Sequence, residues 1–408
     1  MLPFAPTTRG KIMIFLCLAS LGVSLANINL AAGITAAGFS AVLAASLIMS
    51  LLSIRKIEVS RGPGSDCCSG EKITLPVFLT NRSRLTRQSF VVREKLLFTE
   101  SLYGNVTVEA LKPGETRLIN REFNAVRRGS YRLEKIHVVG GDPAGLFRRV
   151  KTFRIPEEIT VYPEMQNITW MPLFIKNKIQ ASISGRPIGI SGIGEEFFGV
   201  REYRRSDSMR FINWKSTARQ GKLMVREFES HSSVTLVILL DGEKKKTGFY
   251  NPLKNNYEYL VKTAASICNY ACEMYCRIIF ISPNGKTGET VILDGTGTGL
   301  KREILDLLST IEASGTSLDN LMDTAEIEVP PNSILYCLTL SENSKLSGRF
   351  DFLLSRGVDI RWLCAPYDNF IDLPSYKPGK SNAYSGYTAV TPMILNYNSN
   401  IAQVLTYG

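Results

Sequence analysis

The sequence predicts three structural parts in order: two membrane-spanning helices, an all-β sandwich, and an α/β domain on a mostly parallel sheet. Three observations support this fold class. Residues from Ile12 to Leu52 are uncharged and largely apolar, short apolar runs separated by turn residues follow as far as Val161, and strand and helix patterns alternate from Val234 onward. A chain of 408 residues exceeds the size of one core, so two or three units are expected. The expected boundaries are 1–56 for the helices, 57–162 for the sandwich, 163–200 for a linker, 201–365 for the α/β domain and 366–408 for a C-terminal tail.

The uncharged interval is too long for one membrane span and suits two spans of about twenty residues each. The polar triplet Asn27-Ile28-Asn29 divides it. Lysines and arginines flank both ends, at Arg9, Lys11, Arg55, Lys56 and Arg61. Since positive charge is retained in the cytoplasm, both ends are expected there. The predicted protein therefore crosses the cell membrane twice and keeps its main domains cytoplasmic.

Two other topologies fit the same apolar interval. Ser24-Leu25-Ala26 resembles a signal-peptidase site, and cleavage there leaves one inward crossing with the bulk of the chain still cytosolic. A single tilted crossing from Ile12 to Leu52 instead places the domains outside the cell.

The charge and cysteine content favour a membrane-attached protein of a reducing compartment. The formal net charge is +11, but lysines and arginines are spread along the chain among acids, with no basic tail. We therefore expect contact with an anionic membrane face and no nucleic-acid partner. The eight cysteines lack the pattern of a disulfide framework. Cys268, Cys272 and Cys276 recur every four residues, which predicts small core side chains on one helix face; a metal site is the alternative, but no histidine accompanies them.

Seven short apolar runs predict the strands of a sandwich of immunoglobulin-like size. Gly, Pro and Asn turns separate the runs, and His137 is expected to pack within its strand. The predicted strands are 73–79, 90–92, 106–108, 117–119, 131–133, 136–139 and 159–161.

The α/β domain is predicted from strands that alternate with amphipathic helices, a pattern typical of a doubly wound sheet. The expected strands are 234–240, 277–282, 289–293 as a hairpin partner, 334–340 and 358–364. The expected helices are 257–276, 300–311 and 346–354. The tail is rich in Tyr, Asn, Ser and Gly, and Ile401 to Leu405 is expected to dock as a final strand.

The central segment from Gly194 to Asp241 is dense in aromatic, basic and acidic residues. Between Glu195 and Glu229 it contains eight Lys/Arg and six Asp/Glu, interleaved in sequence. Guanidinium–carboxylate pairs are strong side-chain hydrogen bonds, so the preferred interpretation is a self-neutralising network that fixes a turn and a short helix. The alternative is an anion- or phosphate-binding site, or an enzyme acting on cell-envelope precursors.

Asp241 ends the first strand of the α/β sheet, where ligands of open α/β sheets usually bind. In a metal-dependent adhesion site, two serines follow such an Asp at alternate positions and supply oxygen ligands to Mg²⁺. Here Glu243 and Lys245 take those positions, and an ammonium group competes with a cation. We therefore expect no metal or other cofactor.

The remaining motifs predict no catalytic constellation. The two histidines are His137 and His231, and no nucleophile elbow surrounds either of them. The Gly-rich segment Asp294 to Gly299 departs from the spacing of dinucleotide-binding loops, which favours a hairpin exit and helix start. The chain is expected not to be an enzyme.

With these residues identified, the chain resembles the bacterial family known as domain of unknown function 58. The first matching elements are Arg127-Arg128-Gly129-Ser130-Tyr131 and Asp142-Pro143-Ala144-Gly145-Leu146-Phe147, in which Ala144 replaces the family's Phe. The central signature is matched by Glu196-Phe197, Arg201-Glu202-Tyr203, Asp207, Arg210, Ile212, Trp214, Ala218-Arg219 and Leu223, with Ser206 where the family has Gly. Asp241 matches the start of the family's adhesion-site-like loop.

The resemblance implies a von Willebrand factor A-like α/β domain and a non-enzymatic role. It implies that the chain partners a MoxR-type AAA+ ATPase and other von Willebrand factor A-like proteins in the assembly or maturation of envelope or other protein complexes. The residues expected to bind a partner are Glu196, Arg201, Tyr203, Asp207, Arg210, Trp214 and Arg219. Asp241 and Glu243 are the remnants of the metal-site position.

Overall fold

The computed structural model divides into two compact units, Met1–Glu164 and Met165–Gly408, and each is described by itself. The described residues are 4–27, 30–173, 197–203, 212–228, 234–244, 247, 255–285, 287–342, 346–370, 390–397 and 399–407. His231 lies outside them.

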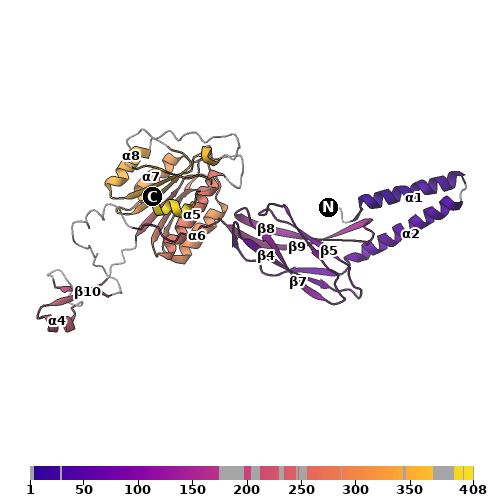
Figure 1. Cartoon of the computed structure of the whole chain (residues 1–408), viewed down its shortest axis with the longest axis horizontal. Helices are drawn as coiled ribbons and strands as arrows, with labels where there is room; N and C mark the ends of the chain where they lie inside the picture. The colour runs from indigo at the N-terminus through magenta and orange to yellow at the C-terminus, as the bar shows by residue number, and fades with distance from the viewer. Residues whose placement is uncertain are drawn as a thin grey trace. The chain divides into compact units, whose positions relative to one another are not determined.

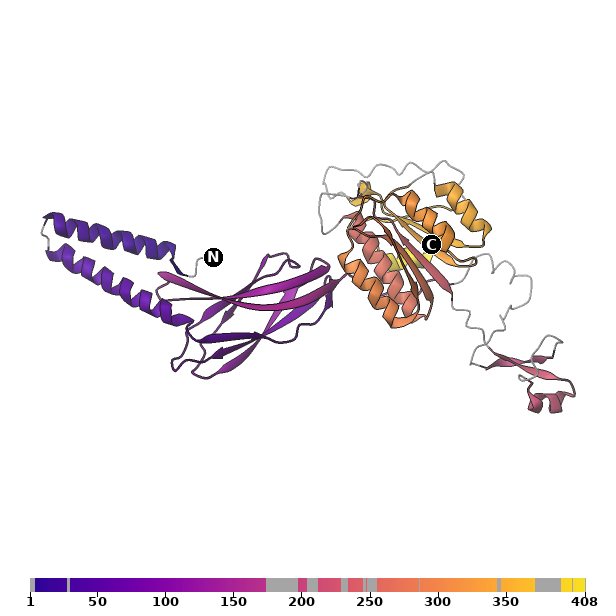
Figure 2. The same ribbon diagram turned by 180° about the vertical axis from the view of Figure 1, so that it is seen from behind.

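Two antiparallel helices, α1 (Thr8–Asn27) and α2 (Leu30–Ser53), open the first unit and lie side by side (Figures 1 and 2). Both are long and apolar enough to cross a membrane, which confirms the two expected helices. At about 1.5 Å per residue, α1 matches the hydrocarbon thickness of a bilayer. Large apolar side chains point outward along the pair, Leu25 being 75% exposed. Polar groups face the partner helix instead: Ser20 Oγ lies 2.6 Å from Thr35 Oγ1.

The rest of this unit is a sandwich of two sheets. One sheet has the order β1-β9-β8-β5-β6, with β3 beside β9, and the other has the order β2-β4-β7. The first contains β1 (Phe4–Pro6), β3 (Cys67–Cys68), β5 (Phe90–Lys95), β6 (Tyr103–Val108), β8 (Gly129–Gly141) and β9 (Phe147–Tyr162). The second contains β2 (Ile57–Arg61), β4 (Lys72–Asn81) and β7 (Thr116–Asn124).

The structure confirms a strand at each of the seven expected positions, but two of the expected strands are parts of one. The two runs 131–133 and 136–139 are halves of the single strand β8, whose pairing with β9 shifts register between Leu133 and Lys135. A register shift of this kind bends a strand without ending it, so the sequence shows two apolar runs. His137 lies in β8, with Nδ1 2.9 Å from Thr152 Oγ1. The strands β1, β2 and β3 were not expected from the sequence.

An apolar core and a charged cluster lie between the two sheets. Ile57, Val77 and Leu79 of one sheet pack against Phe90 and Val92 of the other. Nearby, Glu94 of β5 accepts a hydrogen bond from Arg121 Nη1 of β7 at 2.8 Å and also pairs with Arg61 of β2. Arg61 reaches Glu157 of β9 at 3.5 Å. Since Glu94 is 1% exposed, these pairs join the sheets in the interior.

The second unit contains a six-stranded sheet in the order β14-β13-β12-β15-β16-β17. All pairs are parallel except β13 with β14. Helices α7 and α8 pack on one face against Val237 and Leu239, while α5 and α6 cover the other (Figures 1 and 2). The strands are β12 (Thr235–Leu240), β13 (Arg277–Pro283), β14 (Thr290–Gly295), β15 (Ile334–Thr339), β16 (Asp359–Cys364) and β17 (Met393–Ile394). The helices are α5 (Asn256–Glu273), α6 (Gly297–Thr310), α7 (Leu318–Glu328), α8 (Leu346–Ser355) and α9 (Ile401–Tyr407).

This unit confirms the expected alternation of strands and helices, with two differences. Helix α7 was not expected, and the prediction of a final strand over Ile401 to Leu405 was wrong because these residues form α9. Ile401 and Leu405 are both buried and four residues apart, which suits one helix face. Asn400 Oδ1 accepts the amide N–H of Ala402 at 3.0 Å and so caps the helix. The sixth strand is β17.

Residues 165–173, in the range expected to be a linker, contact the α/β part of their unit. Ser266 Oγ of α5 accepts the N–H of Gln166 at 2.9 Å, and Tyr270 Oη accepts that of Met171 at 3.2 Å. The buried Arg361 donates to Pro172 O and to Tyr336 Oη.

The cysteines have the structural role expected of them. All eight are free, and Cys268 and Cys272 are buried in α5. Cys276 is also buried but lies beyond the end of α5 at Glu273, so the helix expected over 257–276 ends three residues earlier. The Gly-rich segment from Asp294 to Gly299 ends β14 and begins α6, as expected for a hairpin exit.

Candidate functional site

Part of the central signature folds into a small hairpin with a helix, here called the signature hairpin (β10, α4 and β11). Strand β10 (Phe197–Glu202) pairs antiparallel with β11 (Met224–Phe228), and α4 (Trp214–Gln220) lies between them in sequence. Ile212, Met224 and Val225 are buried and supply its apolar contacts. Backbone bonds close the motif, because Leu223 O accepts the N–H of Tyr203 and Met224 O accepts that of Asn213, both at 2.8 Å.

Local sequence fixes both ends of α4. Asn213 caps its beginning, since its Oδ1 accepts the N–H of Ser216 at 3.3 Å. Gly221 ends it at φ +66°, a left-handed conformation that glycine adopts without strain. Thr217 Oγ1 accepts the N–H of Met224 at 3.0 Å and ties the helix to β11. The helix is therefore held at a fixed position on the hairpin.

The outer surface of the signature hairpin combines an indole ring with basic side chains. Trp214 is 68% exposed, and Lys215, Arg219 and Lys222 are also exposed. Lys222 Nζ lies 2.7 Å from Glu202 Oε1, and this hydrogen bond raises the pKa of the lysine. Trp and Arg are the residues most often found at binding hot spots.

The structure brings three of the seven expected partner-binding residues into this motif with described side chains: Tyr203, Trp214 and Arg219. Arg201 lies in β10 opposite Val225. The positions Glu196, Asp207 and Arg210 lie outside the described residues. The Lys222–Glu202 pair is one example of the charge pairing expected for this segment.

Asp241 lies at the carboxyl end of β12 and is fully buried. Its Oδ1 accepts the N–H of Glu243 at 3.0 Å, and its Oδ2 accepts the N–H of Leu340 at 3.1 Å. The carboxylate thus joins the ends of β12 and β15 through backbone amides. This bonding gives both oxygens of the buried carboxylate a hydrogen-bond partner, as buried polar groups generally have.

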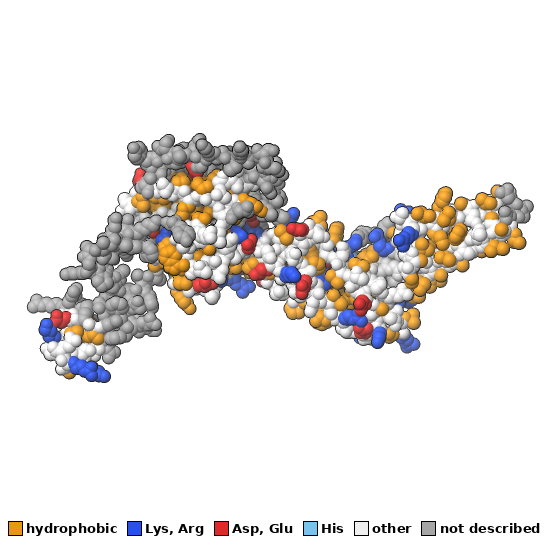
Figure 3. All heavy atoms as spheres, in the orientation of Figure 1, with side chains coloured by type: hydrophobic (Ala, Val, Ile, Leu, Met, Phe, Trp, Pro, Cys, Tyr) orange, Lys and Arg blue, Asp and Glu red, His pale blue; other side chains and the backbone are white. Residues whose placement is uncertain are grey.

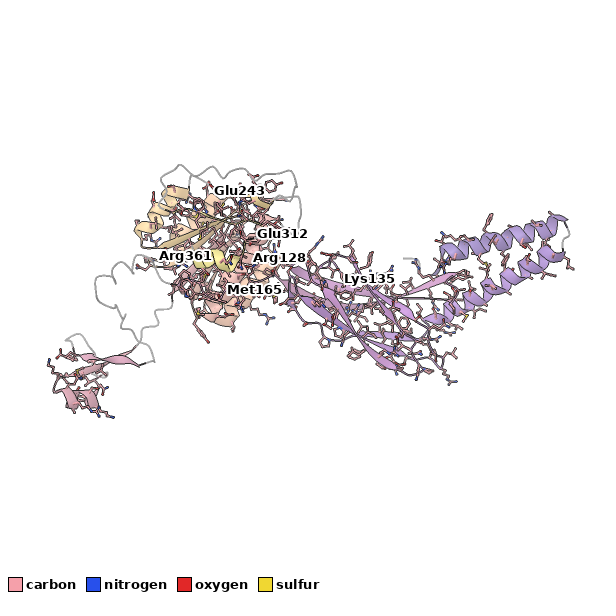
Figure 4. The ribbon with its side chains drawn as sticks, viewed as in Figure 1. Arg128, Lys135, Met165, Glu243, Glu312 and Arg361 are labelled. Atoms are coloured by element: carbon pink, nitrogen blue, oxygen red, sulfur yellow. The ribbon has the colours of Figure 1, made fainter. Side chains whose placement is uncertain are left out.

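The loop after Asp241 is tied to the segment that precedes α7. Gly242 O accepts the N–H of Ser314 at 2.8 Å, and Ser314 O accepts that of Lys244 at 2.7 Å. A Cβ at Gly242 would lie 2.8 Å from Pro283 Cγ, so the loop passes close to β13. Figure 4 shows Glu243 well apart from Arg361 in this unit. Within the described residues, no group of three or more His, Cys, Asp or Glu side chains could hold a metal ion.

A second cluster lies where the helix pair meets the sandwich. It contains the motif from Asp142 to Phe147, for which the sequence indicated no role. Asp142, in the turn between β8 and β9, accepts the N–H groups of Leu146 at 3.2 Å and Phe147 at 2.7 Å. Gly145 completes the turn at φ +68°. Burial raises the pKa of Asp142, but these bonds and one from Ser46 of α2 outweigh it and lower the pKa overall. The turn therefore contacts α2 directly.

The same turn also holds the beginning of α1. Thr7 Oγ1 donates to Gly145 O at 2.6 Å, and Leu146 O accepts the N–H of Thr7 at 2.9 Å. Two arginines of the sandwich cap the other helix, since Arg149 donates to Leu51 O and Arg87 donates to Leu52 O. The turn from Asp142 to Phe147 and these arginines together fix both helix ends to one end of the sandwich.

Together the fold and these sites define a protein with two apolar helices, a two-sheet β module and an α/β unit that carries an exposed, tryptophan-bearing hairpin. Residues 199–323 match the model of the family described as "Protein of unknown function DUF58". This match confirms the resemblance seen in the sequence.

The uncharacterized protein YeaD of Bacillus subtilis (strain 168) is 28% identical over 127 residues, which cover 29% of this chain and 30% of YeaD. The chain thus matches less than a third of that relative's length.

Among solved structures, β-glucosidase from Listeria innocua in complex with glucose matches with a TM-score of 0.18 and 16% identity, over 26% of this chain and 16% of that one. A β-glucosidase from Paenibacillus barengoltzii matches with a TM-score of 0.15 and 10% identity, over 28% of this chain and 15% of that one. Likenesses this slight do not bear on fold or activity.

Proposed function

We propose that this chain is a membrane-anchored, non-enzymatic scaffold that binds other proteins at the cytoplasmic face of the cell membrane. The observation that carries the proposal is the helix pair. Its apolar side chains are exposed along both helices, and both of its ends are fixed to the same end of the sandwich. Exposed apolar surface of this extent is stabilised by lipid, and a hairpin of two spans returns the chain to the side where it began. The basic residues next to the helices favour the cytoplasmic side.

The signature hairpin supports a protein partner. An exposed indole and exposed basic side chains, Lys215 and Arg219, on one short helix held by its own hydrogen bonds form the kind of surface that anchors protein interfaces. Family resemblance supplies the partner class: a MoxR-type AAA+ ATPase, together with other von Willebrand factor A-like proteins. The role proposed is the assembly or maturation of envelope or other protein complexes.

The sheet order supports the finer fold assignment. A parallel sheet with one antiparallel edge strand and helices on both faces fits a von Willebrand factor A-like domain. Two packed sheets of mainly antiparallel strands fit an immunoglobulin-like module.

Membrane anchoring is tested by alkaline carbonate extraction and protease protection of membrane vesicles. We expect the chain to resist extraction. Trypsin should digest both folded units in inside-out vesicles and spare them in right-side-out vesicles. Release by carbonate contradicts the anchor, and digestion in right-side-out vesicles contradicts the cytoplasmic placement.

Partner binding is tested with Trp214→Ala in a pull-down of a purified MoxR-type ATPase by the full chain in detergent. A central aromatic anchor contributes roughly 2 kcal/mol or more, so we expect affinity to fall at least about tenfold. Trp170→Ala is the matched control, because Trp170 is also exposed but lies outside the signature hairpin. If both variants bind the ATPase equally well, the signature hairpin is not the binding surface. If the unmutated chain does not bind, a MoxR-type ATPase is not the partner.

A further inference from the structure

We propose that six basic side chains at the helix-bearing end of the sandwich form a binding surface for anionic phospholipid headgroups. This basic collar consists of Arg9, Lys11, Arg55, Lys56, Arg84 and Arg148, all of them exposed. The inference rests on the proposed membrane anchoring and assigns a lipid class to it. Figure 3 shows basic side chains gathered where the apolar helices meet the sandwich.

The fold collects these residues from distant parts of the sequence. Arg9 Nη1 lies 4.0 Å from the position that a Cβ would take at Gly145, so it reaches the turn between β8 and β9. Arg148 is the second residue of β9, where it pairs with Ala5 of β1. The strand β1 and the bonds of Thr7 to the turn therefore place Arg9 beside Arg148 at the start of α1.

The other half of the collar lies next to the C-terminal end of α2. Lys56 O accepts the N–H of Arg82 at 3.0 Å, which joins the end of α2 to the loop that contains Arg84. Asn81 supports this loop, since its Nδ2 donates to Leu85 O and Leu111 O, both at 3.0 Å. The loop is thus fixed next to Arg55 and Lys56.

Local acids form no ion pair with the collar in the described residues, and Glu109, which follows β6, is an exposed acid at this end. The sequence contains no acidic residue before Glu58. Glu58 pairs with Arg82 at 3.0 Å, Glu115 pairs with Arg117 at 2.5 Å, and Asp142 is buried and bonded to backbone amides. Within the part of the chain that the structure describes, none of the six collar residues forms an ion pair. Positive charge therefore accumulates at this end of the sandwich.

Neighbouring cations also repel one another here. Burial lowers the pKa of Arg87, and the charge of Arg55 lowers it further. Burial and the charge of Arg149 likewise lower the pKa of Lys151. External anions at this surface would reduce that repulsion and stabilise the junction.

The position of the collar identifies the anion as a lipid headgroup. It surrounds the ends of two helices whose lengths match a bilayer, so its cations lie at headgroup depth once the helices are inserted. Leu85, next to Arg84, is 58% exposed, and an apolar side chain between cations suits insertion among headgroups. A free phosphate in solution would gain nothing from this apolar neighbour.

The test uses the full chain reconstituted in vesicles of phosphatidylcholine with phosphatidylglycerol, in which energy transfer to a labelled lipid of each type reports enrichment at the protein. We expect phosphatidylglycerol to be enriched about fivefold at the collar, because each cation near an anionic surface contributes on the order of 1 kcal/mol. The variant Arg9→Gln/Arg55→Gln/Arg84→Gln/Arg148→Gln should lose this enrichment. It keeps Lys11 and Lys56, and protease protection checks that its orientation is unchanged.

The matched control removes four exposed cations from the opposite end of the sandwich, as Lys72→Gln/Lys95→Gln/Arg127→Gln/Arg132→Gln, and should retain the enrichment. Added inorganic phosphate should not displace the lipid. Equal loss in both variants, displacement by phosphate, or no enrichment with the unmutated chain overturns the proposal. Failure of the chain to float with any vesicle instead contradicts the membrane anchor itself.

Discussion

Glu94 lies between the guanidinium groups of Arg61 and Arg121 in the interior of the sandwich. Glu94→Gln removes the charge that both arginines share and leaves two buried cations poorly paired. Breaking a buried ion pair in this way destabilises a protein by about 3–5 kcal/mol. We expect faster hydrogen exchange at the amides of β5 and β7, measured by mass spectrometry on the full chain.

The control for this prediction is Glu58→Gln, which removes the exposed partner of Arg82. Exposed pairs contribute roughly 0–1 kcal/mol, so exchange in the sandwich should hardly change. Equal effects of the two substitutions would show that Glu94 does not join the sheets.

We expect the stability of the junction between the sandwich and the helices to depend on pH through Asp142. Its folded pKa lies below the ordinary value of 3.8, so its stabilising contribution is present above that value and is lost as pH falls through the lower, folded pKa. Asp142→Asn replaces one of the two accepting oxygens with a donor, so one of the two amide N–H groups loses its acceptor, and we expect a loss of about 1–3 kcal/mol at neutral pH. Hydrogen exchange of residues 142–147 should be faster in the variant at neutral pH. The difference from the unmutated chain should vanish in strong acid, and a constant difference would assign the effect to packing.

At the residue scale, the sequence predicts where a residue lies in its strand better than it predicts the hydrogen bonds and ion pairs of its side chain. Asp241 was correctly placed at the end of a strand, because a polar residue after an unbroken apolar run is visible in one dimension. Its bond to the amide of Glu243 is local, but its bond to the amide of Leu340 depends on a segment almost a hundred residues away. The role of Glu94 was missed for the same reason, because its partners Arg61 and Arg121 lie on the other sheet.

At the element scale, apolar periodicity predicts most strands and helices of the α/β unit. Helix α7 was missed although Leu318, Leu321, Met322 and Ala325 recur at helical spacing, because the polar residues between them resemble a loop. Strand β1 was missed because three residues carry no periodic signal. It exists because β9 offers a free edge beside the start of α1.

Gly10 allows α1 and the turn between β8 and β9 to lie in close contact. A Cβ there would lie 2.1 Å from Leu146 O, a contact that only a backbone shift relieves. Gly10→Ala should therefore separate β1 from β9, although alanine is favoured over glycine in a helix by about 1 kcal/mol. We expect faster exchange at the amides of residues 4–7 in reconstituted protein.

Gly22→Ala is the matched control in the same helix, because nothing lies within 4 Å of its added Cβ. That substitution should leave the exchange of residues 4–7 unchanged. Unchanged exchange in Gly10→Ala as well would mean that the turn does not fix the start of α1.

At the scale of the whole molecule, the sequence predicts the order of the parts but not how each is held together. Composition shifts separate the helices, the sandwich and the α/β sheet. The attachment of the helix pair to the sandwich arises from single contacts, such as Arg87 with Leu52 O and Thr7 with Gly145 O, that no local pattern reveals. The chain nevertheless groups the helices and the sandwich into one compact unit.

The division into two compact units predicts that they unfold independently. Tryptophan emission follows the second unit, and hydrogen exchange in β5 follows the first. Trp170, Trp214 and Trp362 all lie in residues 165–408. Leu335 lies in the same buried cluster as Trp362. Leu335→Ala should lower the free energy of unfolding of this unit by about 2–5 kcal/mol and shift the unfolding transition seen by Trp emission. Glu94→Gln should accelerate exchange in β5 without shifting that transition. In the double variant, each unit should show the same change as in its single variant, within about 0.5 kcal/mol, as independent sites do. A Trp transition that moves with Glu94→Gln would show instead that the sandwich stabilises the α/β unit.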